Sequence, residues 1–370
     1  MLTILVFIAV LGLLVLVHEL GHFWAAKKAG CGVDEFGIGF PPRLWSFTYK
    51  GTLYSINLFP IGGFVKIQGE NGEDNPSEKS FVTKSFGWKS LIISAGVLMN
   101  VLLAYVLITG NLIAGVPTEI QPNETFDRFA RVSDRAVTIV QILPESPASL
   151  AGLQAGDVIA SIDGVETTNV DATIAILGNE TAQALQIDYV REDARATVTV
   201  MPTMLEEIGR VGVGVGLSET ATLSYPWYMA WWYGAKRTVL ILWLILQAFG
   251  GMIANIFTKG SLPSDVAGPI GIAVITGEVA RLGFTHLVQF AALLSLNLAI
   301  INILPLPALD GGRLFLIVLE RLRGKKMKVF VEQWIHVIGF AFLIVLMLVV
   351  TARDLFTYGG GIWQSITNLF

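Results

Sequence analysis

The sequence contains little charge and almost no cysteine. Charged residues make up 15% of the chain, compared with about 25% in soluble domains. Cys31 is the single cysteine, which excludes an internal disulfide framework and a Cys-rich zinc knuckle. Acidic residues outnumber basic residues by 29 to 25, so the chain lacks the basic excess of proteins that bind nucleic acid. We therefore expect no nucleic acid partner.

Apolar residues are abundant and are concentrated in long runs. They account for 53% of the chain, and the mean hydropathy is +0.64. A helix needs about 20 apolar residues to cross the bilayer core. Four runs are candidates: 2–17, after which the apolar pattern resumes as far as Ala26, and 91–115, 287–309 and 334–351. A fifth stretch, 239–257, follows several tryptophans and is predicted to be an interfacial or re-entrant helix. The composition thus predicts a polytopic α-helical membrane protein with about four transmembrane helices.

The basic residues near these runs predict the orientation of the chain. Lys27 and Lys28 follow the first run, whereas a signal peptide carries its positive charge before the apolar core. The densest basic cluster comes after the third run and consists of Arg313, Arg321, Arg323, Lys325, Lys326 and Lys328. Because basic loops stay in the cytoplasm, we expect a multi-pass protein of the inner (plasma) membrane. The N-terminus and the segment between the second and third runs should be extracytoplasmic.

Residues 128–217 differ from the rest of the chain, because charged residues return there. Short β-rich runs occupy 136–143, 185–190 and 196–202. The segment PESPASLAGLQAGDVIASIDGVE (144–166) resembles the core signature of a PDZ domain. A PDZ domain would offer a groove for a peptide C-terminus bound as an added strand, and a structural β-domain without a ligand is the alternative. The predicted domains are an N-terminal membrane part (1–127), an extracytoplasmic PDZ domain (128–217) and a C-terminal membrane part (218–370).

The first apolar run contains the motif HELGH (18–22). On a helix, His18 and His22 lie one above the other on one face. Two imidazoles at this spacing can bind one Zn²⁺, with Glu19 placed to take a proton from water. Ionisable side chains at membrane depth are costly unless they are paired, so three of them together indicate a functional site. The alternative is a polar helix end that reaches toward the membrane surface.

A catalytic zinc needs a third protein ligand. His286 and His336 are the other histidines, and each lies at a membrane edge without a companion motif. The better candidate is Asp310, in the sequence NILPLPALDGG (302–312), where Pro305 and Pro307 must break the helix. The predicted topology places both this break and the HELGH motif at the cytoplasmic ends of their helices. We therefore predict a zinc site near the cytoplasmic side.

At this point the chain resembles the site-2 protease family of intramembrane zinc metalloproteases, in the bacterial branch that contains the regulator-of-sigma-E protease. The resemblance covers nearly the whole chain. It is carried by VHELGH (17–22), the IGF of GIGFPPRLW (38–40), PIGGFVKIQGE (60–70), AGVLMN (95–100), the PDZ core, SDVAGPIGIA (264–273) and NLAIINILPLPALDGGRL (297–314). Two features depart from the family pattern: the single PDZ signature, and Val97 where related members have proline.

The resemblance implies a role for each of these residues. His18, His22 and Asp310 would be the zinc ligands, and Glu19 the general base. Asn302 would lie near the catalytic centre and hold the substrate or its oxyanion, with a helix cap or an interhelical hydrogen bond as the alternative. Asn100 is interpreted as such a packing residue. The strands predicted at 53–58 and 64–68 would form a membrane-associated β-hairpin beside the site, whose free edge could hold an unwound substrate. A simple cytoplasmic hairpin is the alternative.

The resemblance also implies the reaction and its substrates. We expect hydrolysis of peptide bonds in the transmembrane segments of single-span membrane proteins, such as anti-sigma factors or remnant signal peptides. The PDZ domain would exclude bulky ectodomains or bind a new C-terminus. Two other classes of protein remain open: a catalytically inactive PDZ-containing membrane scaffold, and an ion-coupled transporter. The transporter would also carry intramembrane His, Glu and Asp residues, but the sequence has no visible inverted repeat.

Overall fold

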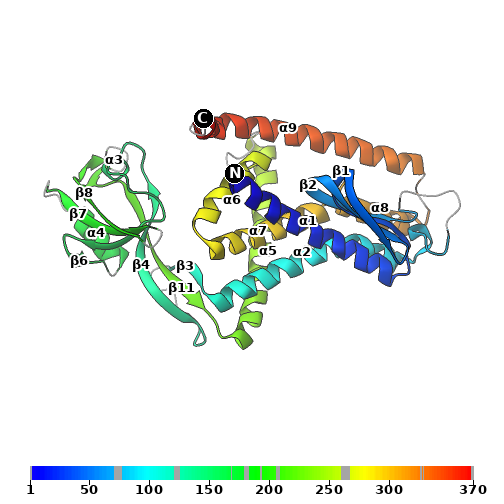
Figure 1. Cartoon of the computed structure of the whole chain (residues 1–370), viewed down its shortest axis with the longest axis horizontal. Helices are drawn as coiled ribbons and strands as arrows, with labels where there is room; N and C mark the ends of the chain where they lie inside the picture. The colour runs from blue at the N-terminus through cyan, green and yellow to red at the C-terminus, as the bar shows by residue number, and fades with distance from the viewer. Residues whose placement is uncertain are drawn as a thin grey trace. The chain divides into compact units, whose positions relative to one another are not determined.

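The computed structural model of the chain divides into two compact units. Figure 1 shows the helices and strands of the whole chain. The structure describes residues 2–70, 77–120, 126–167, 169–178, 183–191, 194–205, 209–259, 267–325, 327 and 329–367. Residues 264–266 of one quoted motif, and Lys326 and Lys328 of the basic cluster, lie outside the described residues. The first unit, here called the membrane unit, comprises Met1–Ile108, Gly234–Arg281 and Leu287–Phe370. The second, here called the insert, comprises Thr109–Tyr233 and Leu282–His286.

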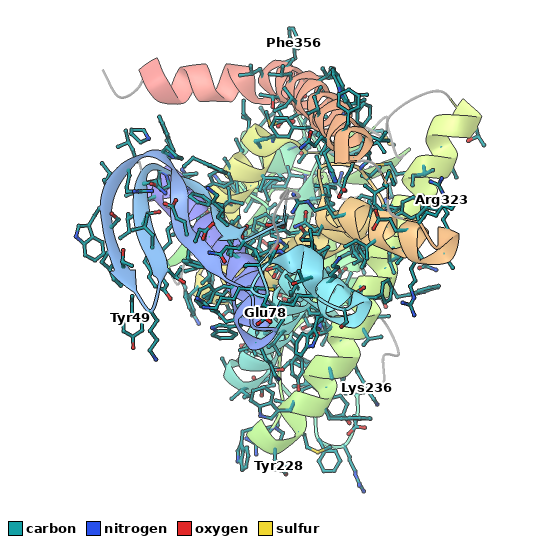
Figure 2. All side chains as sticks on the ribbon, turned by 90° about the vertical axis from the view of Figure 1, so that its right-hand side faces the viewer. Tyr49, Glu78, Tyr228, Lys236, Arg323 and Phe356 are labelled. Atoms are coloured by element: carbon teal, nitrogen blue, oxygen red, sulfur yellow. The ribbon has the colours of Figure 1, made fainter. Side chains whose placement is uncertain are left out.

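Long apolar helices dominate the chain. Within the described ranges, five are long and apolar enough to cross a membrane: α1 (Leu2–Lys28), α2 (Phe86–Ala114), α5 (Trp227–Lys259), α7 (Phe284–Ile303) and α9 (Val329–Thr367). Four of them, α1, α2, α7 and α9, cover most or all of the predicted runs, which confirms the polytopic helical fold. Phe356, 92% exposed, projects outward from α9 in Figure 2. Such outward apolar side chains are what a lipid environment requires.

Residues 239–257, predicted to be an interfacial or a re-entrant helix, form part of helix α5. A re-entrant segment reverses its direction within the membrane, but α5 is one uninterrupted helix of 33 residues. At 1.5 Å per residue it is about 50 Å long. The re-entrant interpretation is therefore wrong. Trp227, Trp231 and Trp232 in its first two turns are exposed, as expected of side chains at the headgroup level.

Strands β1 (Val33–Tyr49) and β2 (Thr52–Ile67) form an antiparallel sheet joined by a tight turn. Phe36 of β1 lies opposite both Tyr54 and Val65, so the first half of β1 separates the two halves of β2. The strands predicted at 53–58 and 64–68 are therefore both extended, but they flank β1 and do not pair with each other. Pro41 and Pro42 lack N–H groups, and they fall where the register shifts between Phe40 and Arg43. A simple pairing of neighbouring strands could not anticipate this break.

One end of this sheet is anchored to helices, and the rest exposes apolar side chains. Val33 and Ile67 are buried in a cluster with Ala26 of α1 and Ile92 of α2. The exposed large side chains of the sheet are Ile38, Phe40, Leu44, Trp45, Phe47, Tyr49, Ile56, Leu58 and Phe59. Tyr49, at the turn, points away from the sheet in Figure 2. Exposed apolar side chains of this kind suit contact with lipid.

The membrane unit also contains two shorter α-helices, α6 (Pro269–Arg281) and α8 (Asp310–Arg323), and a 3-10 turn at Phe81–Thr83. The side chain of Asp354, on α9, is almost fully buried and accepts hydrogen bonds from the backbone N–H groups of Gly268 and Gly271. A carboxylate at a helix N-terminus satisfies free N–H groups and interacts favourably with the helix dipole. This contact fixes α6 to α9.

The insert is built on an antiparallel sheet with strand order β3-β11-β4-β5-β7-β8, and β6 pairs with β5. Its strands are β3 (Val116–Ile120), β4 (Arg131–Ile142), β5 (Val158–Ile162), β6 (Val165–Glu166), β7 (Leu185–Arg191), β8 (Ala194–Val200) and β11 (Val215–Ser224). The short elements α3 (Pro147–Leu150), α4 (Val170–Leu177), β9 (Thr203–Leu205) and β10 (Arg210–Gly212) complete it. Fully buried Ile139, Ile162 and Ile187 form its core. The domain predicted over 128–217 lies inside this unit.

The insert contains a buried ion pair that we expect to dominate its polar stability. The Asp157 carboxylate is 1% exposed and lies 2.6 Å from the Arg191 guanidinium. We predict that Arg191→Met lowers the free energy of unfolding of the insert by about 3–5 kcal/mol, because the buried carboxylate loses its counter-charge. In the matched variant Arg135→Met, a more exposed pair with Glu219 is lost, which should cost about 0–1 kcal/mol. Proteolysis of the purified chain across a urea series measures both, and equal effects would contradict the prediction.

Candidate metal centre

The predicted histidines lie where α1 and α2 approach each other closely. A Cβ atom on Gly21 would lie 2.3 Å from the backbone oxygen of Ala95, so only glycine fits at this position. Gly96 likewise faces the rings of His18 and His22. Small residues let helices in membranes approach closely. The HELGH motif is thereby pressed directly onto α2.

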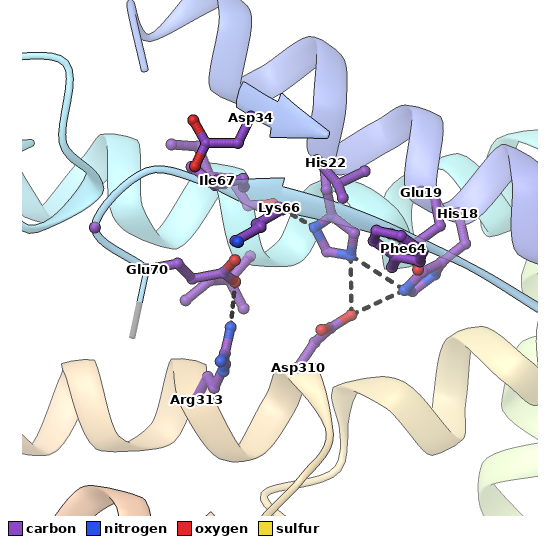
Figure 3. A pocket seen from close by; sticks show the side chains of 14 residues that line it. His18, Glu19, His22, Asp34, Phe64, Lys66, Ile67, Glu70, Asp310 and Arg313 are labelled. Carbon is purple, nitrogen blue, oxygen red and sulfur yellow. Dashed lines mark hydrogen bonds and ion pairs between the residues drawn. The ribbon is translucent and has the colours of Figure 1, made fainter. Parts of the chain in front are cut away.

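The structure brings the three predicted ligands together (Figure 3). The Nε2 atoms of His18 and His22 are 3.1 Å apart, and the Oδ2 atom of Asp310 lies 3.0 Å and 3.3 Å from them, respectively. Tetrahedral Zn²⁺ with bonds of about 2.0–2.2 Å keeps its ligands roughly 3.3–3.5 Å apart. The triangle of donor atoms therefore has the size that a zinc ion requires, after a shift of a few tenths of an ångström.

The protons around this triangle also favour a cation. The Nδ1 atom of His22 lies 2.8 Å from the backbone oxygen of Ile92. A carbonyl oxygen only accepts, so Nδ1 carries the proton and the Nε2 atom of neutral His22 presents a lone pair. The carboxylate of Asp310 places an oxygen 3.3 Å from this Nε2 atom. An anionic oxygen and a nitrogen lone pair thus converge on one point.

Asp310 is held in place by the loop that precedes it. Helix α7 ends at Ile303 and α8 begins at Asp310, so the predicted helix break at the two prolines is present. The backbone N–H of Ala308 donates to the Nδ1 atom of His336 on α9. A Cβ atom on Gly339 of α9 would lie 2.3 Å from the Pro307 side chain. Helix α9 therefore clamps the loop, and this role of His336 was not predicted.

A half-open cavity of about 510 Å³ adjoins the triad. Besides the three ligands, its lining includes Glu19, Asp34, Phe64, Val65, Lys66, Ile67, Glu70 and Arg313. Glu19 thus lines the same cavity as the three predicted ligands. In Figure 3, Arg313 and Glu70 point toward each other and form an ion pair. Asn302 is half-buried in the last turn of α7 and is not among the residues that line this cavity.

Sequence reasoning missed the groups of α2 that support the histidines. The Ile92 partner of His22 is a backbone carbonyl, so no residue type could have revealed it. Asn100 was interpreted as a packing residue, yet its Nδ2 atom lies 3.3 Å from the Nδ1 atom of His18. Ile92, Gly96 and Asn100 follow one another at intervals of four residues, so they share one helix face. This spacing was the available signal that Asn100 faces the histidines.

Taken together, the fold and the site define a polytopic membrane protein in which two histidines and an aspartate meet at a candidate metal centre. The chain matches the sequence profile of peptidase family M50 over residues 6–346. It therefore belongs to peptidase family M50 and is a zinc metalloprotease of the membrane.

Several relatives align over nearly the full chain. The chain is 31% identical to the regulator of sigma-W protease RasP of Bacillus subtilis, covering 95% of this chain and 98% of the relative. It is 31% identical to the zinc metalloprotease RasP of Geobacillus kaustophilus, covering 95% and 97%. It is 35% identical to the chloroplastic membrane metalloprotease ARASP of Arabidopsis thaliana, covering 94% and 77%. Among solved structures, a PDZ domain of an SdrC-like protein from Listeria monocytogenes aligns with 24% of this chain and 92% of its own, at 24% identity and a TM-score of 0.22.

The contact of Gly96 with both histidines generates a prediction. In Gly96→Ala, the new Cβ atom would lie 2.4 Å from the His22 Nε2 atom and 2.7 Å from the His18 ring. The rings must move, so we expect zinc affinity to fall by about tenfold or more. Gly110→Ala on the same helix meets no atom within 4 Å and is the matched control. Chelator competition on the purified chain measures the affinity, and unchanged binding in Gly96→Ala would contradict the close contact.

Proposed function

We propose that this chain hydrolyses peptide bonds within membrane segments, with zinc held by His18, His22 and Asp310 and with Glu19 as the general base. The observation that carries the proposal is the convergence of three ligand atoms within 4.8 Å of one another, beside a cavity that Glu19 also lines. Glu19 follows a ligand directly in the chain, which keeps its carboxylate close to the metal without requiring it to bind.

The roles of the chain's own residues follow from this arrangement. When bound, zinc supplies a Lewis acid that polarises the scissile carbonyl and lowers the pKa of water to about 7. The Glu19 carboxylate accepts the proton of the attacking water and returns it to the leaving nitrogen. The Ile92 carbonyl keeps the His22 Nε2 atom free of a proton. We retain Asn302 as a proposed substrate-holding residue, because it begins the NILPLPALDGG motif that carries the family resemblance.

An edge strand beside the cavity supports a way of holding the substrate. A transmembrane helix hides its amide groups in its own hydrogen bonds, so it must unwind before cleavage. Residues 63–67 of β2 pair with 33–38 on one side, and for the described residues no strand pairs with their other side. Residues 64–67 also line the cavity. We propose that an unwound substrate adds to this edge as a strand, with its scissile bond beside the triad.

We propose single-span membrane proteins as the substrates, including anti-sigma factors and remnant signal peptides. One relative is named a regulator of sigma-W protease, which supports this class. The alternatives of an inactive scaffold and an ion-coupled transporter are less well supported, because neither requires a glutamate directly beside a complete set of zinc ligands.

The proposed orientation has the N-terminus and the insert outside the cytoplasm and the zinc site near the cytoplasmic side of the plasma (inner) membrane. If α5 crossed the membrane, the cluster that includes Arg313, Arg321 and Arg323 would lie outside, against the positive-inside rule. Lys236 and Arg237 lie between the first tryptophans of α5 and its apolar stretch 239–257. Basic and tryptophan side chains both suit the headgroup level, which supports an interfacial position for this end of α5.

Glu19→Gln is the direct test of the proposed mechanism. We expect the rate of cleavage of a single-span substrate to fall by about 10²–10⁴-fold, because the amide cannot accept the proton of water. Zinc content should remain stoichiometric, since Glu19 is not a proposed ligand. Glu278→Gln, at an exposed position on α6, is the matched control and should change neither quantity. Full activity in Glu19→Gln would show that another group is the base.

The insert contains a groove that supports a role in substrate selection. A cavity of about 580 Å³ lies between α4 and the region of β10 and β11, with Ile174, Leu177, Val211 and Val213 in its lining. An apolar groove beside a strand suits a peptide C-terminus bound as an added strand. We propose that the PDZ-like insert selects substrates, either by binding a trimmed C-terminus or by excluding bulky ectodomains.

Removing the insert should separate these two modes of selection. The N–H of Tyr225 donates to the backbone oxygen of Leu112 over 2.8 Å, so the chain enters and leaves the sheet at neighbouring points. Replacing 115–224 with a short Gly-Ser linker therefore removes the whole sheet, and we expect zinc binding to persist. If the insert excludes ectodomains, the deleted chain should cleave the full-length and the trimmed substrate equally well. If the insert binds the trimmed C-terminus, the deleted chain should cleave neither substrate. An unchanged preference would contradict a selective role.

A further inference from the structure

His18 has a buried polar neighbour on α2 that the mechanism above does not use. Asn100 is 0% exposed, and its Nδ2 atom lies 3.3 Å from the His18 Nδ1 atom. Its Oδ1 atom is buried and has no hydrogen-bond partner among the residues that the structure describes. The backbone oxygen of Asn100 accepts a hydrogen bond from Ser295, which is also fully buried, on α7. The amide is therefore held directly against the His18 ring.

The orientation of this amide decides which nitrogen of His18 can bind a metal. If Asn100 Nδ2 donated to His18 Nδ1, neutral His18 would carry its proton on Nε2, the atom that faces His22 and Asp310. Such a ring cannot donate a lone pair to zinc through Nε2. The oxygen and nitrogen of an asparagine amide exchange places by a half-turn, and the choice between them is inferred from the hydrogen-bond network. After this half-turn, Oδ1 faces Nδ1 and accepts its proton.

We propose that Asn100 is a positioning residue for the metal ligand His18: its Oδ1 atom accepts the Nδ1–H of His18 and leaves the Nε2 lone pair free for zinc. The inference rests on the proposed function, because it requires His18 to be a ligand. His22 has the same arrangement: its Nδ1–H donates to the backbone oxygen of Ile92. Metal-binding histidines commonly donate their second N–H to such an acceptor.

The spacing along both helices supports this assignment. The histidines are four residues apart on α1, and their partners Ile92 and Asn100 are eight residues apart on α2, with Gly96 between them facing both rings. His22 contacts the earlier residue of α2 and His18 the later one, so the helices are antiparallel at this point. One face of α2 thus supplies an acceptor for each ring and, between the acceptors, the space that the rings occupy.

The test measures zinc affinity of the full-length chain in detergent by chelator competition, with the visible absorption of the cobalt-substituted protein as a second readout. Asn100→Ala should raise the zinc Kd by about 10–100-fold and change the cobalt spectrum. Asn100→Asp keeps the acceptor and the shape of the side chain, and should bind zinc within about threefold of the natural chain or more tightly. Asn111→Ala is the matched control: it removes another buried asparagine of α2, which donates to the Thr285 carbonyl, and should leave zinc binding unchanged.

His18→Ala separates this inference from the function on which it rests. If His18→Ala does not weaken zinc binding, the ligand assignment fails and the inference fails with it. If His18→Ala weakens binding but Asn100→Ala does not, only the positioning role is overturned. If Asn100→Asp binds zinc as weakly as Asn100→Ala, the acceptor role is overturned in favour of donation or packing. If Asn100→Ala does not fold, Asn100→Asp decides alone, and a zinc Kd raised by about tenfold or more would overturn the proposal.

Discussion

The close, antiparallel contact between α1 and α2 is the constraint on which the metal site depends. Gly21 lies against the backbone of α2, and Gly96 lies against both imidazoles. At an ordinary interhelical distance of about 8–10 Å, side chains would fill this space, and the Ile92 carbonyl could not reach the His22 ring. Two glycines therefore shape the candidate site although neither has a side chain, because they bring a backbone acceptor within hydrogen-bond distance of the His22 ring.

The sequence predicts the membrane helices and the ligands for different physical reasons. The membrane helices follow from composition alone, because a long uncharged stretch of apolar residues is stable as a helix in the lipid bilayer. The His18–His22 pair follows from helical spacing, and Asp310 follows from the prolines that end α7. The register of β1 and β2 could not be predicted: Pro41 and Pro42 indicate where the pairing breaks, but not which segments pair on either side of the break.

The supporting groups of the site were harder to predict than the ligands. A ligand needs a particular side chain, which a motif records, whereas its partner needs only an acceptor in the right place. Ile92 supplies a backbone oxygen and could be almost any residue. Asn100 is chemically specific, but a buried asparagine in a membrane helix has a common alternative role in helix packing, and only the contact with His18 distinguishes the two. The clamp of α9 on Ala308 and Pro307 likewise needed a contact between segments distant in sequence.

The hydrogen bond between Tyr225 and Leu112 has a consequence for how such proteins change over evolutionary time. It holds the residues just before and just after the sheet of the insert side by side. The chain between these two points can therefore be short or long and still connect them. Domain insertions are tolerated where both ends of the inserted segment are close together. The alignment with the Geobacillus relative spans 436 positions, more than the 370 residues of this chain, so that relative carries additional residues. Neighbouring ends of this kind allow the segment between them to be lengthened, shortened or exchanged without moving the helices that it connects.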